Sequence, residues 1–297
     1  MKFIARVPAT SANLGPGFDC LGIALGLYNE VTVDLDAAPS VTWEGEGASE
    51  LPTDGSDMVS RALAHAADAS GVRLPDLALH ALNAIPLERG LGSSSAAAVA
   101  GISLAGAVMA ATGGGGLSKD EVFRLAADFE GHPDNAAPAV YGGFTIADGQ
   151  GAAIRLQPHA SLRPVALIPG EVRLPTAEAR AALSVEVLRE DAVFNLRHTA
   201  EAVVAFTSDP SLLGSALLDR LHQDARLDLV PTVREVFDRL TSAGVPVCVS
   251  GAGPTLMAFD TEAGDVPEPG EGWRRLRLKI DTEGAVVERV DDADGLP

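Results

Sequence analysis

The chain has 297 residues, of which 46% are hydrophobic and only 4% aromatic, so Ala, Val and Leu must supply most of a substantial buried core. Its formal net charge of −19 disfavours nucleic acid as a partner, because nucleic-acid binding usually needs clustered Lys and Arg side chains that release counterions from phosphates. The same charge repels nucleotides, so any nucleotide site must depend on local hydrogen-bond donors, a helix terminus and a bound cation.

The first part of the chain predicts strands. Residues 3–7 suit a short strand, residues 28–35 alternate with period two, and residues 40–44 are a candidate partner for them. Between the first two strands lies a loop at 10–19, whose glycines and proline oppose regular structure.

A helix over 58–69 and a strand over 76–82 lead to an uncharged segment at 91–118. This segment is long enough to span a bilayer. It consists mostly of Ala, Gly and Ser, however, and this composition favours a close-packed core helix, so we expect no membrane partner. A capping-box pattern at Ser118 and Glu121 then predicts the start of another helix.

The second half of the chain changes its pattern. It predicts a strand near 165–168, helices near 191–207, 210–221 and 232–241, and two strands that flank a glycine loop at 250–254. We therefore predict an α+β fold of two domains, 1–160 and 161–297. The tail after Gly264 is acidic and predicts loops, except for residues 273–280.

The two cysteines and the N-terminus indicate an ordinary cellular enzyme. Cys20 and Cys248 are far apart and have no C-x-x-C or His-bearing metal spacing around them, so we expect buried thiols rather than a disulfide or a zinc site. The N-terminus interrupts its apolar residues with Arg6 and Pro8 and lacks the apolar region of a signal peptide. We therefore expect a cytoplasmic location.

The strongest chemical signal is a glycine turn that leads directly into a helix. Its residues are Pro86, Leu87, Glu88, Arg89, Gly90, Leu91, Gly92, Ser93, Ser94, Ser95 and Ala96. The start of a helix has four backbone N–H groups without intrahelical partners and about half a unit of positive charge, so it binds phosphate. The glycines let the backbone approach the phosphate oxygens, and serine hydroxyls donate to them or ligate Mg²⁺. Taken alone, the pattern fits a serine-capped helix after a glycine turn equally well.

Three further segments give this loop a context. The loop is neither a Walker A loop, since no G-K-[ST] follows, nor a Rossmann fingerprint. Its residue order resembles the phosphate-binding motif of the GHMP kinases. Residues 8–19 resemble the N-terminal signature of the homoserine kinase family, residues 130–138 its central motif, and residues 250–255 the C-terminal glycine loop. Four motifs in the same order are far more specific than any one of them.

The resemblance implies a two-domain GHMP kinase fold, with a ribosomal S5 domain 2-like N-terminal domain that binds ATP and a ferredoxin-like C-terminal domain. It also implies an ATP:L-homoserine O-phosphotransferase that makes O-phospho-L-homoserine for threonine biosynthesis. The expected cofactors are ATP and Mg²⁺, and the expected partner is the small molecule L-homoserine. A homodimer is left open.

The resemblance also implies a set of substrate-binding residues. Homoserine is an amino acid, so its pocket needs an anion for the ammonium group and preferably a guanidinium for the carboxylate. The substrate-binding residues that the resemblance implies are Asn13, Asp19, His132, Arg180 and Arg226, the two arginines on shorter matches. Each has an ordinary structural alternative: a turn for Asn13 and Asp19, a helix cap for His132, and a solvated surface for the arginines.

For the metal, the resemblance implies Ser94 and Glu130 as Mg²⁺ ligands, and a surface carboxylate is the alternative for Glu130. Asn135 stands where mevalonate-type relatives carry an aspartate proposed as the catalytic base, and an amide does not accept a proton at neutral pH. Because phosphoryl transfer has a loose transition state in most analyses, positioning and charge neutralisation supply most of the catalysis without a strong base. We therefore predict Asn135 and Arg180 as catalytic residues, with Asn135 orienting the substrate hydroxyl. Asp57 replaces an asparagine that contacts adenine in many relatives, which leaves nucleotide preference open.

Three other functions remain open on the sequence. Another GHMP kinase with a mevalonate- or shikimate-like substrate has no need of a carboxylate for an ammonium group. A serine hydrolase built from Ser94, His132 and Asp134 lacks the G-x-S-x-G elbow, and Pro133 restricts the histidine ring. A non-catalytic ligand sensor on the same fold would release no ADP.

Overall fold

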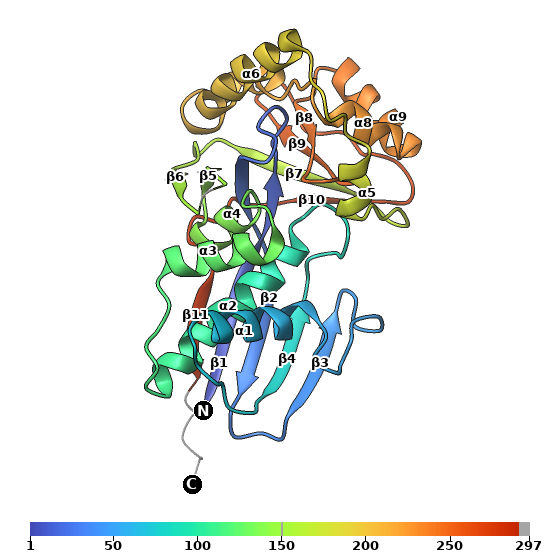
Figure 1. The fold of residues 1–297 in the computed structure, drawn as a ribbon. Coiled ribbons are helices and arrows are strands. Elements are labelled where there is room, and N and C mark those ends of the chain that lie inside the picture. The colour runs from blue at the N-terminus through green and yellow to red at the C-terminus, as the bar shows by residue number, and fades with distance from the viewer. Residues whose placement is uncertain (150, 291–297) are drawn as a thin grey trace.

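The computed structural model describes residues 1–149 and 151–290. A long antiparallel hairpin connects its two halves (Figure 1). Strand β1 (Lys2–Ala12) pairs with strand β2 (Leu21–Asp34) along its whole length, with one irregularity after Pro8. The loop between these strands, 13–20, therefore lies at the far end of the hairpin, next to the second half of the molecule.

The hairpin belongs to a mixed sheet that has seven strands within the described residues. Its order is β11, β1, β2, β4 and β3, and β5 extends it from β2 and pairs in turn with β6. The remaining bounds are β3 (Ser40–Gly45), β4 (Ala78–Asn83), β5 (Phe144–Ala147), β6 (Ala153–Leu156) and β11 (Val286–Val290). Successive side chains of a strand point to opposite faces, and the buried face of β1 carries Phe3, Ala5 and Val7.

Helices cover the buried face of this sheet (Figure 1). They are α1 (Met58–Ala69), α2 (Ser93–Ala111), α3 (Lys119–Glu130) and α4 (Ala136–Tyr141). By length and composition α2 is apolar enough to cross a membrane, but most of its residues are buried inside the protein against α1, α3 and β1. The prediction of a buried core helix is confirmed, and so is the capping box of Ser118 and Glu121 at the start of α3.

The second half contains a four-stranded antiparallel sheet within the described residues, in the order β10, β7, β9, β8. Its strands are β7 (Arg163–Pro169), β8 (Val247–Val249), β9 (Leu256–Asp260) and β10 (Trp273–Arg277). Numbered along the chain, this order is 4-1-3-2, as expected for a ferredoxin-like sheet, although the connection 261–272 holds no helix. The helices between β7 and β8 are α5 (Thr176–Ala181), α6 (Arg189–Thr207), η1 (Pro210–Leu212), α7 (Leu213–Ala216), α8 (Gln223–Asp228) and α9 (Pro231–Ser242). The predicted α+β fold is confirmed.

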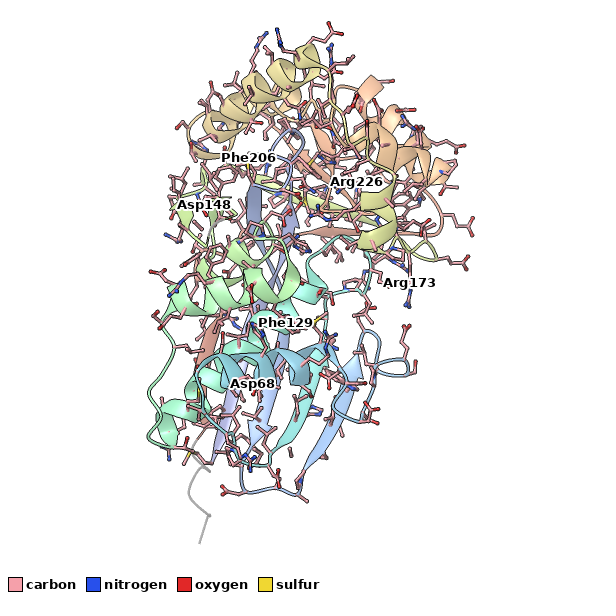
Figure 2. The ribbon with its side chains drawn as sticks, viewed as in Figure 1. Asp68, Phe129, Asp148, Arg173, Phe206 and Arg226 are labelled. Atoms are coloured by element: carbon pink, nitrogen blue, oxygen red, sulfur yellow. The ribbon has the colours of Figure 1, made fainter. Side chains whose placement is uncertain are left out.

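The two halves share one hydrophobic core. Alternate residues of the second sheet, such as Met257 and Phe259, pack in the same cluster as the first sheet and α2. Their neighbours along β9 face the other way and pack in a smaller cluster with α8 and α9. Phe206 of α6 lies at the junction (Figure 2). Its ring stacks on Phe144 of β5, with ring centroids 5.1 Å apart, and meets the Phe259 ring edge-on, with centroids 5.6 Å apart.

Two strand predictions are corrected in the first half. The loop predicted at 10–19 is wrong for residues 10–12, which continue β1, because their small buried side chains allow pairing with residues 22–24 of β2. The pairing of β3 with β2 is also wrong. Strand β3 lies at the sheet edge and runs parallel to β4, with Ser40 opposite Ala78.

Two further corrections concern the second half. The helix predicted at 210–221 ends at Ala216, because the Asp219 carboxylate accepts hydrogen bonds from the backbone N–H groups of Leu221, His222 and Gln223 and holds a loop there. The tail prediction of loops is wrong for residues 286–290, which form β11 and pair antiparallel with β1. Residues 291–297 of that prediction lie outside the described residues.

Replacing Phe206 by Ala is expected to lower the free energy of unfolding by about 3–5 kcal/mol, because the ring is fully buried between both halves and its removal leaves a cavity. Urea denaturation measures this loss. The matched control is Leu196→Ala on the same helix, where the side chain is 71% exposed and the change should stay within about 0.5 kcal/mol. Equal losses in the two variants would contradict a shared core.

Candidate active site

Three sequence motifs meet through a few short contacts. The Ser250 hydroxyl donates its proton to the carbonyl oxygen of Gly90 at 2.7 Å and lies 2.9 Å from the hydroxyl of Ser11, from which it can accept. The backbone N–H of Gly251 donates to the carbonyl of Ala12 at 3.0 Å. Gly90 has a φ of +74°, and a Cβ there would overlap the carbonyl oxygen of Ser250. Only glycine lets the two loops approach this closely.

These loops line a cavity of about 290 Å³ between the two halves. It brings together most of the predicted site residues, namely Asn13, Asp19, Glu88, Arg89, Gly90, Gly92, Ser93, Ser94, Ser95, Glu130, His132, Asn135, Arg180 and Arg226. Four residues of the predicted phosphate loop do not line it: Pro86, Leu87, Leu91 and Ala96. Leu91 and Ala96 are fully buried in the core instead and anchor the loop.

The start of α2 opens into this cavity. Gly92 is the N-cap residue, has a φ of +69°, and no side chain forms a capping hydrogen bond there. The serine-capped helix, the structural alternative for this loop, is therefore wrong. A Cβ at Gly92 would overlap the hydroxyl of Thr10, so a side chain is excluded at this turn. The uncapped N–H groups and the positive end of a 19-residue helix suit an anion such as a phosphate group.

Glu130 lies beside this helix start. Ser94 donates a hydrogen bond to Glu130 Oε1 at 2.6 Å, and Ser95 donates to Oε2. Burial raises the pKa of Glu130 above its usual value, while the two serine hydroxyls oppose that shift. No three His, Cys, Asp or Glu side chains cluster as a metal site within 1–149 and 151–290. A cation held here would thus need phosphate oxygens in addition to the hard oxygen donors of Ser94 and Glu130.

Asn135 is fixed at the start of α4. Its Oδ1 accepts a hydrogen bond from the hydroxyl of Thr10 at 2.7 Å, and its backbone N–H donates to Asp134 Oδ1 at 3.0 Å. His132 Nδ1 lies 3.3 Å from the same Asp134 oxygen, and this contact raises the pKa of His132. Because Oδ1 is taken by Thr10, the Nδ2 amide group of Asn135 is the part that remains for a ligand.

The hairpin loop 13–20 is locally strained. Asn13, Leu14 and Asp19 have backbone φ values of 70°, 47° and 56°, which residues other than glycine rarely adopt. The Asn13 amide compensates by donating to the carbonyl of Gly251 at 2.8 Å and by accepting from the backbone N–H of Asp19 at 3.0 Å. Asn13 is therefore more than a turn residue, since it ties the loop to the second half of the protein.

Asp19 and Arg180 form a bidentate ion pair across the cavity. Arg180 Nη1 and Nη2 donate to the two Asp19 oxygens at 2.9 and 2.7 Å, and each side chain is about one third exposed. The contact with Asp19 raises the pKa of Arg180. The solvated-surface alternative for Arg180 does not describe this geometry.

Arg226 is the more deeply buried arginine. It lies on α8 (Figure 2) and lines the cavity. The residue is only 3% exposed. Nη1 donates to the carbonyl of Gly251 at 2.7 Å, while Nε is buried and has no hydrogen-bond partner among the described residues. Burial, followed by the nearby charge of Arg180, lowers the pKa of Arg226 to about 10. A buried cation without a carboxylate partner suits an anionic ligand.

Three residues that the sequence did not single out, Met58, Arg61 and Phe129, also line the cavity. Phe129 is labelled in Figure 2, and the Arg61 guanidinium lies 5.5 Å from the centre of its ring. Asp57 caps α1 by accepting from the backbone N–H of Ser60, and its second oxygen is buried without a partner in the described structure. Arg89 similarly has a buried Nη1 without a partner. Only the fold brings these positions together, so no motif signalled Phe129 or Arg61.

The serine hydrolase alternative is not supported by this geometry. The hydroxyl proton of Ser94 is donated to Glu130, and the polar contact of His132 is with Asp134. A nucleophilic serine needs a hydrogen bond to its base.

Comparisons with known proteins agree with the geometry. The family model for the N-terminal domain of GHMP kinases matches residues 57–143, and the model for their C-terminal domain matches residues 199–269. The chain is 43% identical to a homoserine kinase of Clavibacter michiganensis subsp. michiganensis, over 97% of this chain and 94% of the relative. It is 44% identical to a homoserine kinase of Rhodococcus opacus, over 98% and 95% of the two chains.

Solved structures show the same architecture. Homoserine kinase from Cytophaga hutchinsonii superposes with a TM-score of 0.80 at 25% identity and covers 97% of both chains. Mevalonate diphosphate decarboxylase from Staphylococcus aureus superposes with a TM-score of 0.67 at 16% identity, over 97% of this chain and 98% of that one. At the latter identity the likeness extends to the fold alone.

Replacing Gly90 by Ala is expected to lower the free energy of unfolding by at least about 3 kcal/mol, because the methyl group meets the backbone of the loop at 250–255. Gly71→Ala is the matched control, since Gly71 also has a positive φ but open space around it, and should cost about 1–2 kcal/mol. Urea denaturation compares the two. A G90A loss no larger than that of G71A would contradict the tight docking of the loops.

Proposed function

Because the chain belongs to the homoserine kinase family of the GHMP kinases, we propose that it transfers the γ-phosphoryl group of ATP to the side-chain hydroxyl of L-homoserine. The product is O-phospho-L-homoserine, an intermediate for threonine biosynthesis. One observation carries the proposal: a single cavity combines the uncapped start of α2 with the opposite charges that an amino acid requires, Asp19, Arg180 and Arg226. Mevalonate- and shikimate-like alcohols have no ammonium group to match Asp19.

The nucleotide end of the cavity is formed by the loop at 86–96. The free N–H groups at the start of α2 and the serine hydroxyls face the phosphates of ATP, and Arg89 offers a buried Nη1 that has no partner in the described structure. Ser94 and Glu130 are the residues that would hold Mg²⁺ together with phosphate oxygens. The ion would neutralise charge on the phosphates.

The acceptor end of the cavity fits the zwitterion of homoserine. Asp19 receives the ammonium group, and Arg180 and Arg226 receive the carboxylate. The side-chain Oδ1 of Asn13 accepts a hydrogen bond from the backbone N–H of Asp19 and holds that residue in place. His132 also lines the cavity, next to Asp134. These roles account for the strained backbone of the loop, which keeps a carboxylate at the cavity edge.

Asn135 and Arg180 carry the catalytic roles in this proposal. Thr10 fixes the Asn135 amide, so that its Nδ2 group orients the acceptor hydroxyl toward the phosphate for in-line attack. Asn135 does not accept the hydroxyl proton, which leaves late to phosphate or water, as a loose transition state allows. Arg180 fixes the carboxylate end of the acceptor and therefore its distance from the γ-phosphate.

We also propose the division into domains 1–160 and 161–297, supported by the two family models, which match on either side of residue 160. Strand β11 of the second segment returns to the sheet of the first, so the two domains are not separate along the chain. The net charge of −19 supports the absence of a nucleic-acid partner. A cytoplasmic location, the absence of a membrane partner and a homodimer stay predictions.

ADP release from MgATP in the presence of homoserine, mevalonate, shikimate or galactose tests the activity. We expect release with homoserine to exceed release with mevalonate or shikimate by about tenfold to a hundredfold, because these two keep a carboxylate but have no ammonium group, and to exceed release with galactose by at least on the order of a hundredfold, because galactose has neither charged group. Chelation of Mg²⁺ by EDTA should abolish the release. Equal or faster release with another alcohol would overturn the proposed substrate.

Arg180→Ala is expected to lower kcat/KM for homoserine by about tenfold to a hundredfold, since it removes a charge-assisted contact with the carboxylate, and to leave the KM for ATP unchanged. Arg173→Ala is the control, because Arg173 forms a similar bidentate pair with Glu50 on the surface, outside the cavity. Steady-state kinetics of both variants decide the point. A parallel loss of ATP affinity in R180A would place Arg180 at the wrong end of the cavity.

A further inference from the structure

A buried histidine lies directly behind Arg226. The side chain of His222 is fully buried at the start of α8. Its Nε2 lies 2.8 Å from the carbonyl oxygen of Gly15, and its Nδ1 lies 3.0 Å from Arg226 Nη1. A carbonyl oxygen only accepts, so Nε2 carries the proton, and a guanidinium only donates, so Nδ1 is the acceptor. His222 is therefore neutral in one defined tautomer, and burial lowers its pKa in agreement.

The surroundings hold this ring in place. The Asp219 carboxylate, itself fully buried, accepts the backbone N–H of His222 at 2.9 Å and the side-chain amide of Asn195 at 2.6 Å. On the other side the Phe18 ring lies 5.2 Å from the His222 ring and 5.3 Å from the Arg226 guanidinium. His222 thus has one orientation, and its Nδ1 always faces Arg226.

Arg226 donates both of its hydrogen bonds from the same nitrogen, Nη1. His222 Nδ1 and the Gly251 carbonyl oxygen accept from Nη1, and within the described residues Nε and Nη2 have no hydrogen-bond partner. Nε and Nη2 form one edge of the planar guanidinium, which is the edge that binds a carboxylate in a bidentate manner. Because His222 is fixed beside Nη1, it determines the rotation of the whole Arg226 guanidinium. The Nε–Nη2 edge then stays available for a ligand.

We infer that His222 is a positioning residue for substrate recognition, which orients Arg226 through its unprotonated Nδ1 so that the Nε–Nη2 edge takes the substrate carboxylate. The inference rests on the proposed homoserine kinase function for the identity of the carboxylate. The contact between His222 and Arg226 does not depend on that function. His222 itself does not line the cavity, so it acts only through Arg226.

Two substitutions separate the two ring nitrogens. An Asn side chain places its Oδ1 where Nδ1 stands, so H222N keeps the acceptor for Arg226 and loses the bond to Gly15. A Gln side chain places its amide N–H near Nε2, so H222Q keeps the bond to Gly15 and loses the acceptor. We expect H222Q to raise the KM for homoserine on the order of tenfold with little change in kcat or in the KM for ATP. H222N should stay within about threefold of the wild type.

A loss of homoserine affinity in H222N with a normal H222Q would assign the role to the Gly15 bond and overturn the inference. Equal losses in both variants would also overturn it, because they would show a purely structural ring. The double variant H222Q/R226A supplies a second test, since a residue that acts through Arg226 should add no more than about twofold to the effect of R226A alone.

The free energies of unfolding of the wild type, H222Q, R226A and H222Q/R226A form a double-mutant cycle. This cycle is measured without substrate, so it does not depend on the activity. Coupling between His222 and Arg226 in unfolding, together with no ADP release from wild-type protein with homoserine, would refute the proposed function and keep the contact. Additive effects on both unfolding and KM would refute the positioning role and leave the function intact.

Discussion

The close docking of Gly90 on Ser250 is the contact on which the rest of the active site depends. It joins two loops about 160 residues apart in the chain, and the Ser250 hydroxyl extends the junction to Ser11 on β1. Any side chain at Gly90 separates the loops, because it meets backbone rather than a flexible side-chain end. One small contact thus places the uncapped start of α2, the hairpin loop 13–20 and two arginines around the same cavity.

Local geometry overrides the net charge of −19 in two different ways. Arg180 is compensated in full by Asp19, at a position that water still reaches. Arg226 is buried and donates hydrogen bonds only to uncharged acceptors, the Gly251 carbonyl oxygen and the neutral His222 ring, although the charges of Asp19, Asp134 and Asp219 also act on it. The Arg226 guanidinium has lost its water and has no hydrogen-bonded carboxylate in exchange, which costs free energy. A ligand carboxylate that binds it therefore gains more binding free energy than it would at a solvated arginine. Of the two arginines, Arg226 is therefore the one whose side chain has no carboxylate hydrogen-bonded to it.

The sequence predicted what local physics determines. The capping box of Ser118 and Glu121, the helix start after Gly92 and the order of the motifs each follow from neighbouring residues. The strand at 10–12 was missed because buried partners on another strand satisfy its polar groups. The Asp19–Arg180 pair and the Thr10–Asn135 bond join residues more than 120 positions apart, and no spacing in the chain announces them. The proposed roles of these residues stay predictions.

Strand β11 gives the fold a consequence for synthesis on the ribosome. Strand β1 pairs with β2 on one side and with residues 286–290 on the other, so the first half is not a separable N-terminal piece. At about 5–20 residues per second, β1 waits on the order of tens of seconds for that neighbour, with one edge open to other chains. A nascent chain interrupted before residue 286 therefore presents an unpaired strand edge. Synthesis of β11, rather than of the first domain alone, covers the outer edge of β1.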